Sequence, residues 1–187
     1  NDLPGSDAKT WNFSAGYNIT LVEGRNDYEF IVTDKVLKTA TLKRTFLYDN
    51  KEPVVTIISP ALNSWNGVKS LDVSGNVTED TGISKIGYKV VEGSSGMVPS
   101  DPPSWTPFTV NGNSISASIT ASEGVNTLWI YAQDSIGNSN SSSPLSHEFK
   151  VDTEAPVLTV DNEAIINLKT SDTGIVFSGT ATDSAQL

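Results

Sequence analysis

The chain has 187 residues, 37% of them hydrophobic, which is enough apolar material to bury a core. Its 22 acidic residues outnumber its 12 basic ones, and the net charge of −10 would repel nucleic-acid phosphates and anionic lipid surfaces, so we expect neither as a partner. There is no cysteine, which excludes disulfides, thiolate metal sites and cysteine nucleophiles. No apolar run reaches the roughly 18 residues of a membrane helix, so no membrane insertion is expected in this segment.

Alternating apolar and polar residues predict β-strands along the middle of the chain, and no stretch has the spacing of a helix. The Asn111-Gly112 pair favours a type I′ hairpin, because both central residues of that turn need positive φ. About seven strands is the count of an immunoglobulin-like β-sandwich. In chain order the predicted strands, with their inward-facing residues, are 54–58, 71–77 (Leu71, Val73, Gly75, Val77), 86–90 (Ile86, Tyr88, Val90), 108–110, 115–119 (Ile115, Ala117, Ile119), 128–132 (Leu128, Ile130, Ala132) and 145–151.

The sequence repeats itself at an interval of about 100 residues, and this is the strongest pattern in it. The motif Glu-Gly-x-Asn at 23–26 returns at 123–126. Further along, the interval grows slightly, as expected when repeats differ by insertions in surface loops. Other matched pairs are Ile19 and Ile119, Asp34 and Asp134, Asp49 and Asp152, and Pro53 and Pro156.

The repeat divides the chain into three parts of an all-β, tandem immunoglobulin-like array. Residues 1–49 match the C-terminal part of a unit, residues 50–152 form a complete unit, and residues 153–187 match the N-terminal part of a further one. The joints at 49–53 and 152–156 each contain a proline, which restricts bending. Both outer parts are interpreted as cut inside a domain, either by fragmentation or because they complete one another between chains.

Four runs in the repeat resemble the bacterial immunoglobulin-like repeats of surface and secreted proteins. They are Glu123-Gly124-Val125-Asn126, the strand 128–132, Asp134-Ser135-Ile136-Gly137-Asn138 and Val151-Asp152-Thr153-Glu154-Ala155-Pro156. The resemblance covers nearly the whole chain. It implies an extracellular or cell-surface location and a role as stalk, spacer, adhesive module or accessory domain. In the first part the run 34–38 lacks the Gly-Asn pair, so we expect that loop to turn differently.

Two Asp-Thr-Gly triplets, at 80–82 and 172–174, deserve comparison with aspartic proteases, which build paired carboxylates from two such turns. They occupy different places in the repeat and are followed by isoleucine instead of Ser or Thr, so we interpret both as turns. His147 is the only histidine, which argues against a zinc site or a Ser/His/Asp triad. We therefore expect no enzymatic activity.

Trp129 and Tyr131 alternate out of phase with the core residues of their strand, so they should lie on its outer face. The favoured interpretation is that they cover a neighbouring strand or loop. The alternative is sugar stacking, in which Trp65, Trp105 and Trp129 would recognise a glycan. That alternative would make the chain a carbohydrate-binding or accessory module of a secreted enzyme.

Acidic residues gather in the loops that an immunoglobulin-like sandwich places at one pole. Carboxylates converging from several loops suit a hard cation with irregular coordination, and the resemblance implies calcium at the joints. The alternative is that they only solvate the surface or cap turns. The candidate calcium ligands are Asp49, Glu52, Glu79, Asp80 and Asp134 for the complete unit, and Asp152, Glu154 and Asp183 for the next.

These patterns predict a non-catalytic structural or adhesive array. Its units would act as an extracellular stalk or spacer. Calcium would stiffen the joints where it binds, and no cofactor would be required. The expected partners are neighbouring immunoglobulin-like domains of the same protein, together with a host or cell-surface receptor or a glycan. A third alternative is the subunit of a self-complementing extracellular filament.

Overall fold

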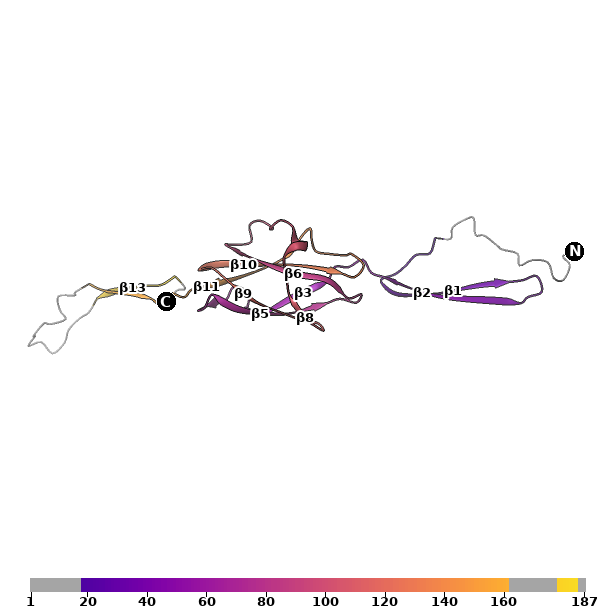
Figure 1. The fold of residues 1–187 in the computed structure, drawn as a ribbon, viewed down its shortest axis with the longest axis horizontal. Helices are drawn as coiled ribbons and strands as arrows, with labels where there is room; N and C mark the ends of the chain where they lie inside the picture. Colours follow the sequence, from indigo (N-terminus) through magenta and orange to yellow (C-terminus); the bar gives the residue numbers. More distant parts are fainter. Residues whose placement is uncertain (1–17, 162–177, 185–187) are drawn as a thin grey trace, which may run out of the picture. The chain divides into compact units, whose positions relative to one another are not determined.

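A computed structural model of the chain describes residues 18–161 and 178–184 (Figure 1). Its contacts divide it into two compact units, Asn1–Asp49 and Asn50–Leu187. The predicted division of the chain into three parts, at 49 and at 152, stays a prediction. Phe177, which the repeat predicts to be a core residue, lies outside the described residues, as does the triplet at 172–174.

The middle of the chain is a sandwich of two sheets. Its strand order is that of an immunoglobulin-like domain, in which the first, second, fifth and fourth strands form one sheet and, in the other, the sixth strand lies between the third and the seventh. The four-stranded sheet has the order β3 (Val54–Ser59), β5 (Ser70–Thr78), β9 (Ser114–Thr120), β8 (Thr109–Asn111). The five-stranded sheet has the order β4 (Trp65–Asn66), β11 (Leu145–Val151), β10 (Gly124–Asp134), β6 (Ile83–Glu92), β7 (Thr106–Pro107).

The seven predicted strands are all present, and β4 and β7 are two-residue additions to them. All pairings are antiparallel except that of β4 with β11. The only helical element in the described part of the chain is a short 3₁₀ turn, η1 (Pro102–Ser104). The prediction of an all-β fold is therefore confirmed. Among these same residues, no helix is long and apolar enough to span a membrane.

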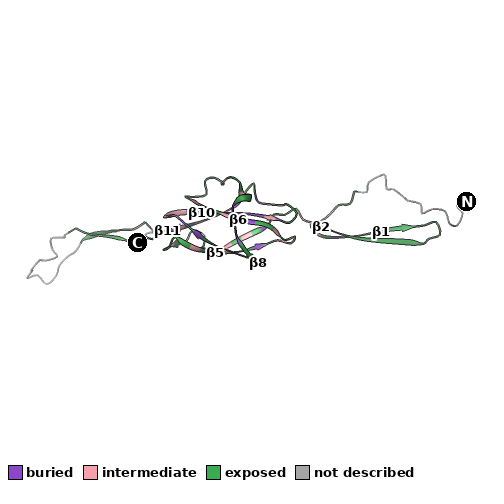
Figure 2. Ribbon diagram, in the orientation of Figure 1, coloured by how far each residue is buried: buried purple, intermediate pink, exposed green. Residues whose placement is uncertain are grey.

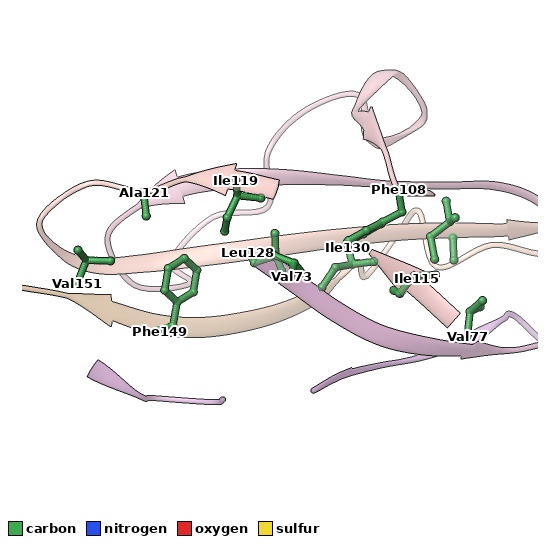
Figure 3. Close-up of a cluster of buried hydrophobic side chains, with 12 residues drawn as sticks. Val73, Val77, Phe108, Ile115, Ile119, Ala121, Leu128, Ile130, Phe149 and Val151 are labelled. Atoms are coloured by element: carbon green, nitrogen blue, oxygen red, sulfur yellow. The ribbon is translucent and has the colours of Figure 1, made fainter. Parts of the chain in front are cut away.

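The core lies between the two sheets, as the alternating pattern predicts (Figure 3). The inward residues of β10 are fully buried, since Leu128, Ile130 and Ala132 are 0% exposed. Tyr88, Val90, Leu71 and Ala117 are only partly buried, because they lie at the margin of the cluster. The buried cluster comprises Val73, Val77, Ile86, Phe108, Ile115, Ile119, Ala121, Leu128, Ile130, Ala132, Phe149 and Val151.

A second, smaller core lies on the outer face of the five-stranded sheet. Trp129 and Tyr131 point away from the main core, as predicted, and pack with Trp105. Trp105 follows η1, and its indole N–H donates to the carbonyl of Ser100 over 3.1 Å, which holds the ring against the sheet. The favoured interpretation of the two strand aromatics, as packing beneath a loop, is therefore correct.

The turn between β8 and β9 differs in detail from the prediction. Asn111 and Ser114 are paired, so the central residues of the turn are Gly112 and Asn113, one position later than expected. Of these two only Gly112 has positive φ, at 59°. Positive φ at the first central residue alone is the pattern of type II′, not type I′. The hairpin was predicted correctly, but its turn type was wrong.

Two further pairs of strands flank the sandwich in the sequence. In the first unit, β1 (Gly24–Thr33) pairs with β2 (Thr39–Tyr48), and its strands are largely exposed (Figure 2). Near the other end, β12 (Val157–Val160) pairs with β13 (Gly179–Thr182) in a sheet of their own. The β1–β2 pairing has the form of β10–β11, because each begins with a glycine opposite the last residue of the second strand.

Candidate metal site and the acidic loops

Three of the eight predicted ligands come together. Asp49 directly precedes Asn50, the first residue of the second unit. Glu79 directly follows β5, and Asp134 ends β10. Each offers one carboxylate oxygen, and these oxygens all lie within 4.8 Å of one another. In the part of the chain that the structure describes, this is the only such group of three acidic or metal-ligating side chains.

The spacing of these oxygens is compatible with a shared cation. Calcium binds oxygen at about 2.3–2.6 Å, so two ligands on opposite sides of one ion lie about 5 Å apart. Asp134 is 1% exposed and the other two residues are half-buried, which would reduce screening by solvent. The group can therefore supply part of an irregular oxygen cage, and water or carbonyl groups would complete it.

Asp134 already has a structural task. Its Oδ1 accepts backbone N–H groups from Ile136, Gly137 and Asn138 at 2.9, 2.6 and 2.8 Å. Its Oδ2 accepts the side-chain amide of Asn138 at 2.7 Å. These bonds hold the loop after β10 in one conformation. Any cation would have to share Oδ2 with that amide.

Glu79 is also part of a turn. Its Oε1 accepts both the backbone N–H and the hydroxyl of Thr81 at 3.0 Å. Gly82 follows with φ of 90°, and its carbonyl accepts the backbone N–H of Ser135 at 2.8 Å. The triplet at 80–82 thus forms the turn between β5 and β6, in agreement with the turn interpretation.

The remaining predicted ligands do not belong to this group. Glu52 lines a shallow hollow with Lys51 and Asn138, and Asp80 is not part of the cluster. At the second joint, the hydroxyl of Ser184 donates to Asp152. The other two candidates, Glu154 and Asp183, line one open hollow of about 270 Å³. The predicted second calcium site is therefore reduced to neighbouring carboxylates with no group of three among the described residues.

Sequence reasoning missed the contact that holds the second joint. The Glu123 carboxylate accepts both the backbone N–H and the hydroxyl of Thr153, and it also forms an ion pair with Lys69 at 3.1 Å. The Thr153 hydroxyl, and then Lys69, keep the pKa of Glu123 below its ordinary value of 4.5. The next residue back, Asp152, donates its N–H to the carbonyl of Asn66 at 3.0 Å. The start of this joint is thus bound to the sandwich.

The asparagine of the repeated Glu-Gly-x-Asn motif makes the same hydrogen bonds in both copies. In the complete unit, Asn126 Oδ1 accepts the N–H of Ser122 at 2.9 Å, and its amide donates to the carbonyls of Ser122 and Gly124 at 2.7 and 3.1 Å. Asn26 makes the same three bonds, to Val22 and Gly24, at 2.8, 2.7 and 2.9 Å. We call this arrangement the asparagine clamp. The repeated motif in the sequence identified the asparagine, but it gave no information on the hydrogen bonds that this residue makes.

The loop at 34–38 can be compared with its later copy at 134–138. Asp34 Oδ1 accepts the N–H groups of Val36 and Lys38 at 2.8 and 2.9 Å, as Asp134 does in the complete unit. Leu37 has φ of 65° where the later copy has Gly137 at 110°. The two loops therefore share the aspartate cap but differ at this residue, since Leu37 N–H donates to the backbone carbonyl of Asp34 at 3.1 Å, whereas Gly137 N–H donates to the Asp134 side chain at 2.6 Å. The expectation of a different turn holds at this one residue.

Most of the tryptophans considered for sugar stacking are buried, and so is the single histidine. Trp105 and Trp129 are 8% and 6% exposed, so neither presents a face on which a sugar could stack. Trp65 is 41% exposed, and the Lys150 ammonium lies 5.1 Å from its ring centre. His147 is buried, and its Nε2 lies 2.9 Å from the carbonyl of Pro60, which it contacts as a donor.

No protein-family model and no curated protein matches this chain. Solved structures with a similar arrangement include an engineered protein (20% identity, TM-score 0.40, covering 58% of this chain and 22% of that one). They also include an R347E mutant of the SrpA adhesin from Streptococcus sanguinis, with 15% identity and a TM-score of 0.37, covering 59% of this chain and 64% of that one. A third such structure is that of fibronectin(III)-like modules of CbhA from Clostridium thermocellum, with 16% identity and a TM-score of 0.37, covering 71% of this chain and 64% of that one. The chain spans less than two thirds of each, and the likeness concerns the fold alone.

Proposed function

We propose that this chain is a non-catalytic stretch of an extracellular array, in which immunoglobulin-like units act as a stalk or spacer on a bacterial surface. Its partners are the neighbouring units of the same protein. Its work is mechanical, since strand ladders and short joints transmit force and hold other parts of the protein at a distance.

The asparagine clamp is the observation that carries this proposal. It recurs after 100 residues with the same three hydrogen bonds, each time at the start of a hairpin of the same register. After each hairpin, only residues 49–53 or 152–156 precede the next strand. Repeated units joined by such short proline-containing segments are suited to a semi-rigid row.

Calcium binding by Asp49, Glu79 and Asp134 is the second part of the proposal. One divalent ion would offset the mutual repulsion of three carboxylates and tie Asp49 to two loops of the sandwich. Bending at the first joint would then require breaking metal bonds. The second joint has its own restraint in the contacts of Glu123, so we expect calcium to act mainly on the first.

Small-angle X-ray scattering of the chain, in millimolar calcium and then in chelator, tests both parts. A compact chain of this length would have a radius of gyration of about 16 Å. We expect a clearly larger value in both conditions, with a longer maximum dimension in calcium. The variant Glu79→Gln should lose the calcium response, and Glu92→Gln, a carboxylate at the exposed end of β6, should keep it.

The two parts fail separately. A radius of gyration near the compact value would contradict the spacer function itself. An elongated particle that does not respond to calcium would leave the spacer function in place and remove calcium from it. A response that Glu92→Gln abolishes as fully as Glu79→Gln would show that the metal acts through net charge and not through this group.

A further inference from the structure

The sequence contains two Asn-Gly pairs, at 66–67 and 111–112. An asparagine followed by glycine is prone to lose its side-chain amide, because glycine has no side chain to hinder the approach of its backbone nitrogen to the asparagine Cγ. Asparagine is for this reason counted among the thermolabile residues of proteins. Both pairs belong to the sandwich, and the structure gives them different surroundings.

The pair at 111–112 is exposed at the tip of the β8–β9 hairpin. Asn111 ends β8, and Gly112 is the first central residue of the turn. Among the residues that the structure describes, the Asn111 side chain has no hydrogen-bond partner. A Cβ added to Gly112 would have nothing within 4 Å, so the space beside this residue is open. The Asn111 side chain is therefore free to turn toward the nitrogen of Gly112.

The pair at 66–67 is held in place by its hydrogen bonds. The side-chain amide of Asn66 donates to the carbonyl of Lys150 at 3.0 Å, and to the hydroxyl and carbonyl of Ser64 at 3.2 and 3.4 Å. Its backbone carbonyl accepts the N–H of Asp152 at 3.0 Å. The nitrogen that would have to leave Asn66 is thus bound by three contacts that Asn111 lacks.

We propose that Asn111 is a self-modification site, at which the folded protein converts an amide into a carboxylate while Asn66 is protected. The backbone nitrogen of Gly112 attacks Asn111 Cγ and forms a new C–N bond. The side-chain nitrogen then leaves as ammonia and takes the proton of the attacking N–H. Water opens the resulting succinimide ring at either of its two carbonyls, which gives aspartate or isoaspartate. Water is the only other reactant, and the step involves no oxidation or reduction.

The isoaspartate product alters the β8–β9 hairpin, because its main chain gains one carbon. The pairing of Asn111 with Ser114 then loses its register, and β8 has only three residues. Phe108, directly before β8, and Ile115 in β9 are both part of the main core (Figure 3). The modification therefore loosens one edge of the sandwich with time. This inference goes beyond the spacer function and depends on neither that function nor calcium.

Peptide mass spectrometry of the full chain, sampled during storage in mildly alkaline buffer, measures the conversion at both sites. Asn111 should convert about 100-fold faster than Asn66, the factor that corresponds to three ordinary hydrogen bonds. In urea that unfolds the chain, the two rates should converge, because both asparagines then precede an unhindered glycine. Labelling with an isoaspartyl methyltransferase identifies the isoaspartate. Asn111→Gln should abolish conversion at this position, since its longer side chain would have to close a larger ring.

Two outcomes would overturn the proposed site. The first is a folded chain in which Asn66 converts as fast as Asn111, or in which Asn111 does not convert at all. The second is a rate difference that persists in urea, which would assign it to neighbouring residues in the sequence and not to the fold.

The effect on the hairpin is tested with the isoaspartyl form, separated by ion exchange. It should unfold at a lower urea concentration than Asn111→Asp, which adds the same charge without lengthening the main chain. Equal unfolding midpoints for these two forms would refute the proposed loosening of the sandwich edge.

Discussion

Replacing Asn126 by alanine tests the importance of the asparagine clamp. The side chain is 1% exposed and makes three hydrogen bonds, all to the backbone of residues just before it. A hydrogen bond contributes about 1 kcal/mol net to stability, and backbone groups left unpaired in a buried site cost at least as much. We therefore expect Asn126→Ala to lower the free energy of unfolding of the sandwich by about 3 kcal/mol.

Urea denaturation followed by tryptophan fluorescence measures this loss. Three of the four tryptophans, Trp65, Trp105 and Trp129, belong to the unit that contains the sandwich, so the signal reports mainly on unfolding of that unit. For a domain of about 100 residues, an m value of about 1.3 kcal/mol per M is typical in urea. The expected loss then moves the midpoint down by about 2 M, with little change in slope.

Asn26→Ala is the matched control, since it removes the same three bonds from the other unit. It should leave the fluorescence midpoint within about 0.3 M of the unaltered chain, because all the hydrogen bonds that it removes lie within the first unit. A shift below about 0.5 M for Asn126→Ala, or equal shifts for both variants, would refute the reasoning that the clamp stabilises the sandwich.

Three further predictions concern the sandwich and its joint. Gly75→Ala should destabilise it by about 3 kcal/mol in thermal unfolding, because the new Cβ would lie 2.3 Å from the carbonyl of Thr56. Ile130→Ala should cost about 3 kcal/mol in urea, as expected for a side chain with no exposure. The Glu123 carboxyl should titrate below pH 4.5 in an NMR titration followed at the Thr153 amide.

Each of these predictions has its own check. Gly67→Ala has nothing within 4 Å of the added carbon and should be nearly neutral. Ile136→Ala removes a side chain that is 57% exposed, so a loss as large as that of Ile130→Ala would contradict the burial argument. Because the pKa of Glu123 is lowered on folding, its stabilising contribution is complete above about pH 4.5 and disappears as pH falls through the folded value. A midpoint at or above 4.5 would rule this out.

The strands of the sandwich were predictable because one face of each is buried. Alternation along β5, β9 and β10 encodes which side faces the core, and a one-residue slip would expose residues such as Leu128. The hairpin between β8 and β9 was also predictable from its glycine. Its register was not, because Asn111 and Asn113 flank Gly112 and local sequence favours both alternatives.

Contacts between distant segments could not be predicted in this way. Trp105 lies in a loop without periodicity, and only the structure places it over Trp129 on the outer face of the sheet. Similarly, Glu123 and Thr153 are 30 residues apart, and no spacing rule links them. The acidic pole was predicted from topology, and the structure brings the carboxylates of Glu79 and Asp134 together. Topology gave no information on which carboxylates accept hydrogen bonds from the protein's own N–H groups.

The dual role of Asp134 determines how the proposed calcium site would behave. Its Oδ1 is engaged by three backbone N–H groups, and Asp34 makes the corresponding cap in a loop for which no acidic group of three is found among the described residues. The turn alone therefore explains the aspartate cap, and a cation would bind only through the carboxylate oxygens that the turn leaves available. A site with so few available ligand oxygens belongs with the weak calcium sites of extracellular modules, which bind at about 10⁻⁴ to 10⁻³ M. Stiffening of the first joint should accordingly appear at extracellular calcium concentrations and be absent at micromolar ones.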